Sequence, residues 1–207
     1  MVGDHDSSGA RRHGHSMTDL RTEELEADSL AVGATASGKS ACAGRVDAST
    51  FRAVVGHSPT GVSVVTARDA DGCHYGITVS SYASLSLDPP LVLICIDTRS
   101  RIHSVLSAAR SFAMNILCVE QEPLARQFSS RADDRFAGVS CSPGKSGDLL
   151  ISNAIAYLEC RLVEVVSAGD HSIFIGAVSA AGARDGSPLL RYRGAYTEPR
   201  ARRTPDT

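Results

Sequence analysis

A run of small hydroxyl side chains, followed by a proline-broken turn and an apolar segment, constrains this chain more than any other feature. The hydroxyl cluster consists of Thr78, Ser80, Ser81, Ser84 and Ser86. Asp88-Pro89-Pro90 then breaks the chain, because adjoining prolines supply no N–H to a ladder, and residues 91–96 read as a fully buried strand. The pattern predicts two strands joined by a fixed turn outside the ladder. The cluster suits a flat polar ligand, whereas the plainer interpretation is an edge strand that faces water.

Composition predicts one folded domain between two tails. The chain has 207 residues, and its first aromatic residue is Phe51. Residues 1–45 are rich in Gly, Ser, Ala and charge, so they bury too little apolar surface to offset their conformational entropy. We therefore expect a disordered N-terminal tail over residues 1–45, a folded domain over residues 46–197, and a disordered, basic C-terminal tail over residues 198–207.

Charge and hydropathy argue against several classes of partner. The formal net charge of −2 predicts neither nucleic acid nor an acidic membrane surface as a partner, and no apolar run has transmembrane length. Residues 1–30 lack the apolar segment of a secretory signal, so we expect a cytoplasmic location. The six cysteines form neither a C-x-x-C pair nor a zinc spacing, which favours reduced thiols and predicts no metal site.

Apolar spacing predicts a mainly β domain with short helices. The expected helices lie near residues 47–56, 100–109 and 120–130. The expected strands lie near residues 62–66, 73–79, 91–96, 111–117, 154–166 and 173–178. Residues 140–148 are expected to form a loop. The chain has no G-x-G-x-x-G after a strand, no Walker loop and no G-x-S-x-G, so spacing alone names no catalytic residue.

Several of these segments, in order, resemble motifs of the flavin reductase-like family. Residues 76–93 resemble Gly-x-Thr-x-Ser-Ser-aromatic followed by Ser-x-Asp-Pro-Pro-Leu-Val-Leu, with Tyr82 where the family often has Phe. Residues 169–178 resemble Gly-Asp-His-x-Ile-Phe-x-Gly-x-Val, and residues 188–196 resemble Pro-Leu-Leu-x-Tyr-x-Gly-x-Tyr. The resemblance implies a mainly β (α+β) fold. This fold is an antiparallel FMN-binding split β-barrel, closed or nearly closed, of about six strands with short peripheral helices.

The resemblance also implies an NAD(P)H-dependent flavin reductase, in which hydride passes from nicotinamide C4 to flavin N5. Such a protein must chiefly stack two rings with the reacting atoms roughly 3–3.5 Å apart. The implied cofactors are FMN or FAD and NADH or NADPH, and the sequence does not choose within either pair. The implied partners are a second copy in a homodimer, with flavin near the interface, and a separate flavin-dependent monooxygenase that receives the reduced flavin.

Two alternatives stay open at this point. One is a split-barrel protein that binds flavin tightly and passes electrons to another acceptor, such as ferric iron. The other is a flavin-binding module without nicotinamide turnover, although storage alone gives no reason for the Gly169-Asp170-His171 segment. Fold alone does not separate these functions.

Individual site residues follow from the same resemblance. The implied cofactor-binding residues are Gly76, Ile77, Thr78, Ser80, Ser81, Cys95, Ile96, Asp97, Ser100, Arg101, Asn115, Gly169, Asp170 and His171. Ser100 and Arg101 would hold a phosphate at a helix start. His171 would be the catalytic residue and would position the nicotinamide.

Plainer interpretations exist for several of these residues. Ser100 could simply cap a surface helix, and His171 could be a turn histidine bonded to Asp170. Asn115 either ties down local backbone or faces the flavin, and the resemblance favours the flavin. Arg135, in an Arg-Phe-x-Gly segment that resembles the family, is either a surface charge or a contact to the dinucleotide.

Overall fold

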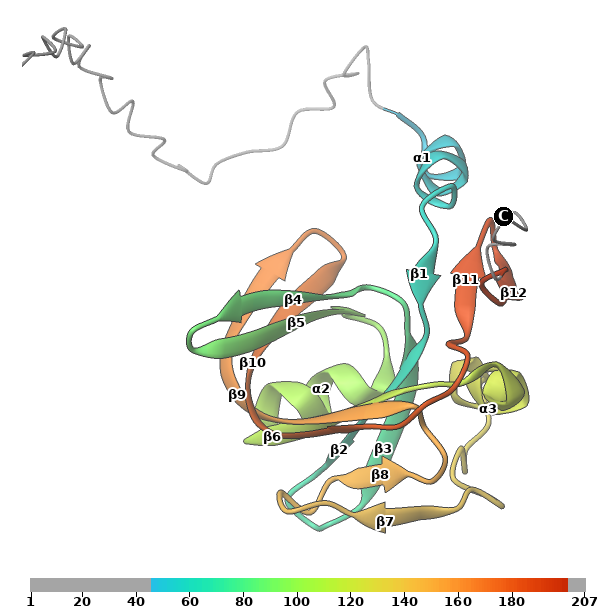
Figure 1. Cartoon of the computed structure of the whole chain (residues 1–207). Helices are drawn as coiled ribbons and strands as arrows, with labels where there is room; N and C mark the ends of the chain where they lie inside the picture. Colours follow the sequence, from blue (N-terminus) through green and yellow to red (C-terminus); the bar gives the residue numbers. More distant parts are fainter. Residues whose placement is uncertain (1–45, 201–207) are drawn as a thin grey trace, which may run out of the picture. The chain divides into compact units, whose positions relative to one another are not determined.

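A curled antiparallel sheet is the main feature of the computed structural model, which describes residues 46–200 (Figure 1). Its seven strands are ordered β3-β2-β6-β9-β10-β5-β4. In chain order they are β2 (Ser63–Arg68), β3 (His74–Val79), β4 (Tyr82–Leu87), β5 (Pro90–Asp97), β6 (Ser111–Ile116), β9 (Ala156–Ala168) and β10 (His171–Ala183). The predicted mainly β split barrel is confirmed, with seven strands in place of about six.

The barrel is split because its two edge strands are neighbours in the chain. β3 and β4 are the two edges of the sheet, yet only Ser80 and Ser81 separate them in the sequence. The sheet must therefore curl until its edges come close together. The edges are joined covalently through the two serines, but β3 and β4 do not pair, so each keeps one unpaired side.

Short helices and small sheets accompany the barrel. The helices are α1 (Ala48–Val55), α2 (Arg101–Ala108), the 3-10 helix η1 (Val119–Gln121) and α3 (Glu122–Ser129). β1 (Thr60–Gly61), β11 (Leu190–Tyr192) and β12 (Ala195–Thr197) form one small sheet, and β7 (Cys141–Pro143) and β8 (Leu149–Ile151) form another. The expected loop over residues 140–148 is therefore partly wrong, because a three-residue strand is too short to leave a periodic signal. Among the described helices, none has the length and apolar character needed to cross a membrane.

β2 is buried on both faces, which explains its nearly continuous apolar sequence. Val65 packs inside the barrel, in a cluster that includes Ile102 and Leu106 of α2. Val64 points to the other face and packs in a second cluster, with Phe128 of α3. The strand therefore joins the barrel interior to the layer that α3 covers.

β5 corrects two expectations drawn from the sequence. Val92, Ile94 and Ile96 are buried, but the residues between them are only half-buried, so the strand alternates and is not fully buried. Its side chains alternate because only one face packs on the barrel interior. The Ile96 side chain is 2% exposed within that interior, and the expected contact of this residue with a flavin stays a prediction. Pro90 opens β5 opposite Leu87 and therefore belongs to the ladder, as a first strand residue without an N–H can.

Gly76 is required by packing between β3 and α3. A Cβ at this position would collide with the ring of Phe128 and would lie 3.2 Å from Phe136. Phe128 is fully buried and meets Phe136 edge to face, with ring centroids 4.9 Å apart. A larger residue at position 76 would force α3 away from the barrel, at a cost of about 1–3 kcal/mol. The glycine is therefore explained by α3 rather than by a ligand.

Asn115 ties β6 to the backbone of its neighbours. Its Nδ2 donates to the carbonyls of Val64 at 3.2 Å and Leu149 at 3.3 Å, and its Oδ1 accepts from the Ile151 N–H at 2.8 Å. The side chain is fully buried and offers no surface to a ligand. Asn115 thus has the first of its two expected roles, which is to tie down local backbone, and its flavin contact stays a prediction.

We predict that Asn115→Ala lowers the free energy of unfolding by about 2–3 kcal/mol, because buried N–H and C=O groups lose their partner. Urea denaturation followed by circular dichroism measures this loss. The folded fraction of the variant should bind flavin with unchanged affinity. An unchanged unfolding midpoint combined with weakened flavin binding would instead favour the predicted flavin contact of Asn115.

Candidate functional site

Many of the residues that the sequence analysis predicted for the site lie along the split of the barrel. One side of the opening is formed by residues 76–79 of β3. The other side is formed by residues 95–97 of β5, which lie beyond the last residue that pairs with β4. Ser80 and Ser81 link the two sides of the opening, and the Ser81 carbonyl accepts a hydrogen bond from the Cys95 N–H at 2.9 Å. β3 and β5 come into contact beside this crossing. Segments about 20 residues apart in sequence therefore face each other across one opening.

β3 offers unpaired backbone groups along the split. It pairs only with β2, so its other edge is open. The Gly76 carbonyl accepts from Arg135 Nη1 at 3.0 Å, so it points away from β2. The N–H and C=O of a strand residue point to the same side, and this direction repeats every second residue. Thr78 therefore also turns its N–H and C=O to the open edge, where they match a flat ring that carries alternating donors and acceptors.

The side chains of β3 itself are committed to the fold. Thr78 Oγ1 donates to the Ala125 carbonyl of α3 at 2.7 Å, and Ile77 packs against the barrel interior. These two residues can serve a ligand chiefly through their backbone. Ser80 is half-buried and Ser81 is exposed, so their hydroxyls lie nearer to solvent.

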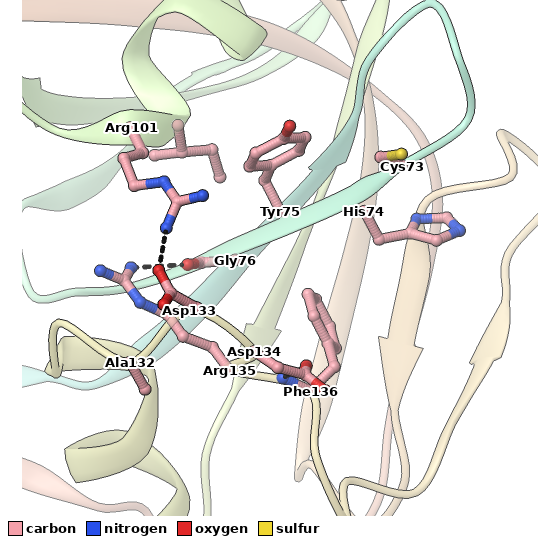
Figure 2. A pocket seen from close by; sticks show the side chains of 11 residues that line it. Cys73, His74, Tyr75, Gly76, Arg101, Ala132, Asp133, Asp134, Arg135 and Phe136 are labelled. Carbon is pink, nitrogen blue, oxygen red and sulfur yellow. Dashed lines mark hydrogen bonds and ion pairs between the residues drawn. The ribbon is translucent and has the colours of Figure 1, made fainter.

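A polar cavity of about 190 Å³ lies where β3 meets the start of α2, and its walls include two arginines and two aspartates. Figure 2 shows Arg101 of α2 and Arg135 of the segment after α3 reaching into it. Partial burial, with a smaller contribution from the charge of Arg101, lowers the pKa of the Arg135 guanidinium, which still stays protonated at neutral pH. Arg135, which the sequence left undecided, is thus part of this cavity.

The cavity also contains an acidic partner that sequence reasoning missed. Arg101 Nη1 pairs with Asp133 Oδ1 at 3.2 Å, and the Asp133 side chain is fully exposed. An exposed pair of this kind is weak, so an anionic ligand can displace the carboxylate. No local signal links two residues that lie 32 positions apart.

Ser100 precedes α2 without capping it. As the N-cap residue it makes no side-chain cap bond, and its Oγ is buried without a hydrogen-bond partner among residues 46–200. An unsatisfied buried hydroxyl is costly, and the first N–H groups of a helix have no partner within the helix. The expected phosphate contact of Ser100 and Arg101 stays a prediction. Arg101 lines this cavity and Ser100 precedes it in the chain, at a helix start that favours an anion.

The turn between β9 and β10 lies next to the same helix start. The Asp170 carbonyl accepts from the Thr98 N–H at 3.0 Å and from Thr98 Oγ1 at 3.1 Å, and His171 pairs with Asp97 in the sheet register. His171 Nδ1 lies 2.7 Å from Asp170 Oδ1, and this hydrogen bond lowers the pKa of the Asp170 carboxyl. The side chain of His171 is 41% exposed. Its bond to Asp170 therefore orients a ring that a ligand can still reach.

Two further predicted residues have local roles in the structure. The Asp97 carboxylate accepts from the Arg99 N–H at 2.8 Å and from Arg99 Nε at 3.1 Å, and these bonds hold the pKa of Asp97 well below its usual value. Asp97 thus fixes the turn from β5 into α2. Burial raises the pKa of the Cys95 thiol, so Cys95 is uncharged at neutral pH. Both residues lie beside the split, but the Asp97 charge is paired with Arg99 and the Cys95 thiol carries no charge.

Comparison with known proteins identifies the family of this chain. The model of the flavin reductase like domain matches residues 55–200. A flavin reductase (NADH) of Kitasatospora aureofaciens is 42% identical over 157 residues, which cover 74% of this chain and 82% of the relative. The reductase component of a 4-nitrophenol 4-monooxygenase/4-nitrocatechol 2-monooxygenase of Rhodococcus opacus is 41% identical over 151 residues, which cover 73% and 80% of the two chains.

A solved structure shares both the fold and much of the sequence. The NADH:FAD oxidoreductase of Streptomyces globisporus C-1027, solved in complex with NAD and FAD fragments, is 36% identical, with a TM-score of 0.73. The match covers 76% of this chain and 96% of that one. With the family model spanning most of the described residues, this chain belongs to the flavin reductase like domain family.

Proposed function

We propose that this protein is an NADH-dependent flavin reductase that supplies reduced flavin to a separate monooxygenase. One observation carries the proposal: the unpaired edge of β3 runs into a cavity that holds Arg101 and Arg135 beside the start of α2. A flat polar ring can bind the strand edge while its phosphate binds the two guanidinium groups. The relatives named as flavin reductases support the same reading.

The chain's own residues would bind and orient two ligands rather than perform acid-base chemistry. A bound flavin supplies N5 as the hydride acceptor. The backbone of Thr78 and the hydroxyls of Ser80 and Ser81 hold the polar ring, and Ser100 with Arg101 and Arg135 holds the phosphate. Bringing the two reacting atoms to roughly 3–3.5 Å is then the main contribution of the protein.

We infer that NADH is the hydride donor and that FAD is preferred over FMN. Two guanidinium groups from different elements suit a diphosphate better than a single phosphate, because each can form its own paired hydrogen bonds. The relatives named for NADH, and the one named for FAD, support these choices.

His171 would orient the nicotinamide. Its Nδ1 donates to the Asp170 carboxylate, which leaves the Nε2 lone pair of the neutral ring free to accept from the N–H of the nicotinamide carboxamide. The residue would then act through position and would gain or lose no proton. Gly169 and Asp170 would contribute by forming the turn that presents it.

We also propose a homodimer, as the family resemblance implies. Support comes from large apolar side chains that are exposed in the single chain, including Phe51 at 60%, Val54 at 66% and Leu87 at 92%. A second copy could cover such surface, which monomeric proteins rarely leave exposed in clusters. The expected cytoplasmic location stays a prediction.

We predict that the purified protein oxidises NADH only when FAD or FMN is added, with the higher kcat/KM for FAD. Absorbance of the reduced nucleotide measures the rate, and NADPH is tested in parallel. A protein that retains a yellow, permanently oxidised flavin would instead favour a binding module. Reduction of a retained flavin followed by reduction of ferric iron would favour the other alternative.

We predict that His171→Ala raises the KM for NADH about tenfold, because one hydrogen bond that positions the carboxamide is lost. Flavin affinity, measured by fluorescence quenching, should change less than about twofold. His171→Gln keeps a hydrogen-bond acceptor, the side-chain carbonyl, in place and should recover part of the loss. An unchanged KM in the alanine variant would remove His171 from the site.

We predict that Asp133→Asn tightens FAD binding about two- to fivefold, because Arg101 loses a competing carboxylate. The gain should disappear at high salt, which screens exposed charges. Asp185→Asn, at an exposed position outside this cavity, serves as the control. Weaker binding in Asp133→Asn would mean that the carboxylate itself contacts the ligand.

A further inference from the structure

A histidine of α2 links the helix that begins at the predicted phosphate site to the strand that begins at His171. His103 lies two residues after Arg101, and Ser172 is the second residue of β10. The Nε2 atom of His103 lies 2.9 Å from Ser172 Oγ, so the two side chains share a hydrogen bond. The sequence analysis assigned a role to neither residue.

The surroundings of this hydrogen bond keep both of its partners in place. Ser172 is 3% exposed and lies on the same face of β10 as Phe174, which is fully buried in the barrel interior. The ring of His103 is half-buried and meets the ring of Phe174 edge to face, with centroids 5.5 Å apart. A hydrogen bond that is shielded from water in this way is stronger than an exposed one. It therefore holds α2 firmly against β10.

Among residues 46–200, this is the only hydrogen bond that joins a side chain of α2 to a strand of the barrel. The hydroxyls of Ser104 and Ser107 donate to carbonyls within the helix. Arg101 pairs with Asp133, an exposed residue outside the sheet. The apolar side chains of α2 pack in the barrel interior, but apolar packing is not directional. His103 therefore supplies the directional contact that fixes the rotation of α2 against β10.

A second contact joins the same two segments on the other side of His171. Thr98, which precedes α2, donates through its N–H and its Oγ1 to the Asp170 carbonyl, at 3.0 Å and 3.1 Å. Asp170 and Ser172 are the two chain neighbours of His171. Both neighbours are thus bonded to the segment that starts α2. Together the two contacts fix the distance between His171 and the start of the helix.

The two segments carry the residues proposed for the two ligands. Ser100 and Arg101 would hold the flavin phosphate, whereas His171 would orient the nicotinamide. Hydride transfer requires the reacting atoms to lie roughly 3–3.5 Å apart, and a misplacement of about 1 Å can cost about a hundredfold in rate. The distance between His171 and the start of α2 therefore bears on the rate of the chemical step.

We propose that His103 is a positioning residue for hydride transfer, an inference that rests on the proposed reductase function. Its hydrogen bond to Ser172 fixes the start of α2 relative to His171, and this distance sets how the nicotinamide ring stacks on the flavin ring. His103 acts through Ser172 rather than through contact with either ligand, and it exchanges no proton. A side chain that keeps the hydrogen bond should therefore keep the function.

Variants that remove only the hydrogen bond test this proposal. His103→Phe keeps a ring beside Phe174, Ser172→Ala removes the hydroxyl, and His103→Gln keeps a side-chain nitrogen that can bond Ser172. Ser107→Ala, on the same helix, removes a hydroxyl that bonds only within the helix and is the matched control.

Steady-state kinetics gives the first measurement. We expect kcat to fall about tenfold or more in His103→Phe and in Ser172→Ala, because the reacting atoms are misplaced. The KM for NADH and the Kd for FAD should change less than about threefold. The two changes combined should cost no more than either one alone, since they remove the same interaction. His103→Gln should recover part of the loss, and Ser107→Ala should behave as the wild type.

Absorbance of the stacked rings gives a second measurement that does not depend on turnover. NAD⁺ added to the protein with dithionite-reduced FAD gives a long-wavelength charge-transfer band when the two rings lie flat on each other. At saturating NAD⁺, this band should lose most of its intensity in His103→Phe and in Ser172→Ala, and Ser107→Ala should retain it.

The outcomes separate a positioning role from a purely structural one. An unchanged kcat and an unchanged band in His103→Phe and Ser172→Ala would overturn the proposal. A lower unfolding midpoint in urea, with a normal kcat and band in the folded fraction, would make the bond purely structural and also overturn it. A wild type that oxidises no NADH but shows a band that depends on His103 would contradict only the reductase function.

Discussion

The unpaired edge of β3 is the constraint on which the rest of the structure depends. Two serines join β3 to β4, so the sheet has to curl, but β4 continues along β5 and leaves β3 paired on one side only. A fully closed barrel would consume these N–H and C=O groups in a ladder. Because the split leaves them open, a ligand with complementary donors and acceptors can complete the strand, and α2 begins where such a ligand would end.

Several polar or small residues in the predicted site hold the fold that surrounds it. Asn115 satisfies buried backbone, Thr78 anchors α3 through its hydroxyl, and Gly76 makes room for Phe128. These residues fix the distance between β3 and its neighbours. Their importance to function is therefore indirect, since the open edge keeps its shape only while α3 stays packed against the outer face of β3.

Electrostatics distinguishes two cavities that contain arginines. In the first cavity, with Arg101 and Arg135, the exposed carboxylate of Asp133 forms a weak ion pair with Arg101 and reduces the local positive charge. The second, with Arg52, Arg191 and Arg193, has no acidic side chain in its walls. A cavity whose positive charge is partly neutralised releases an anionic product more readily than a cavity without acidic side chains, because it binds the anion less tightly. This difference suits the proposed function, in which reduced flavin leaves for a separate monooxygenase.

The sequence by itself predicted the main strands of the barrel, a helix near residues 47–56 and the motifs that mark the family. In the structure Asp47 caps that helix and accepts from the Ser49 N–H at 2.9 Å. These features are local, since periodicity, caps and turns depend on residues a few positions apart. Only the tertiary structure decided which faces those residues present. It buried Ile96 and Asn115, paired Arg101 with Asp133, and brought Arg193 to the end of α1. Contacts between distant segments depend on how the sheet curls and what packs on it, and no local pattern records that.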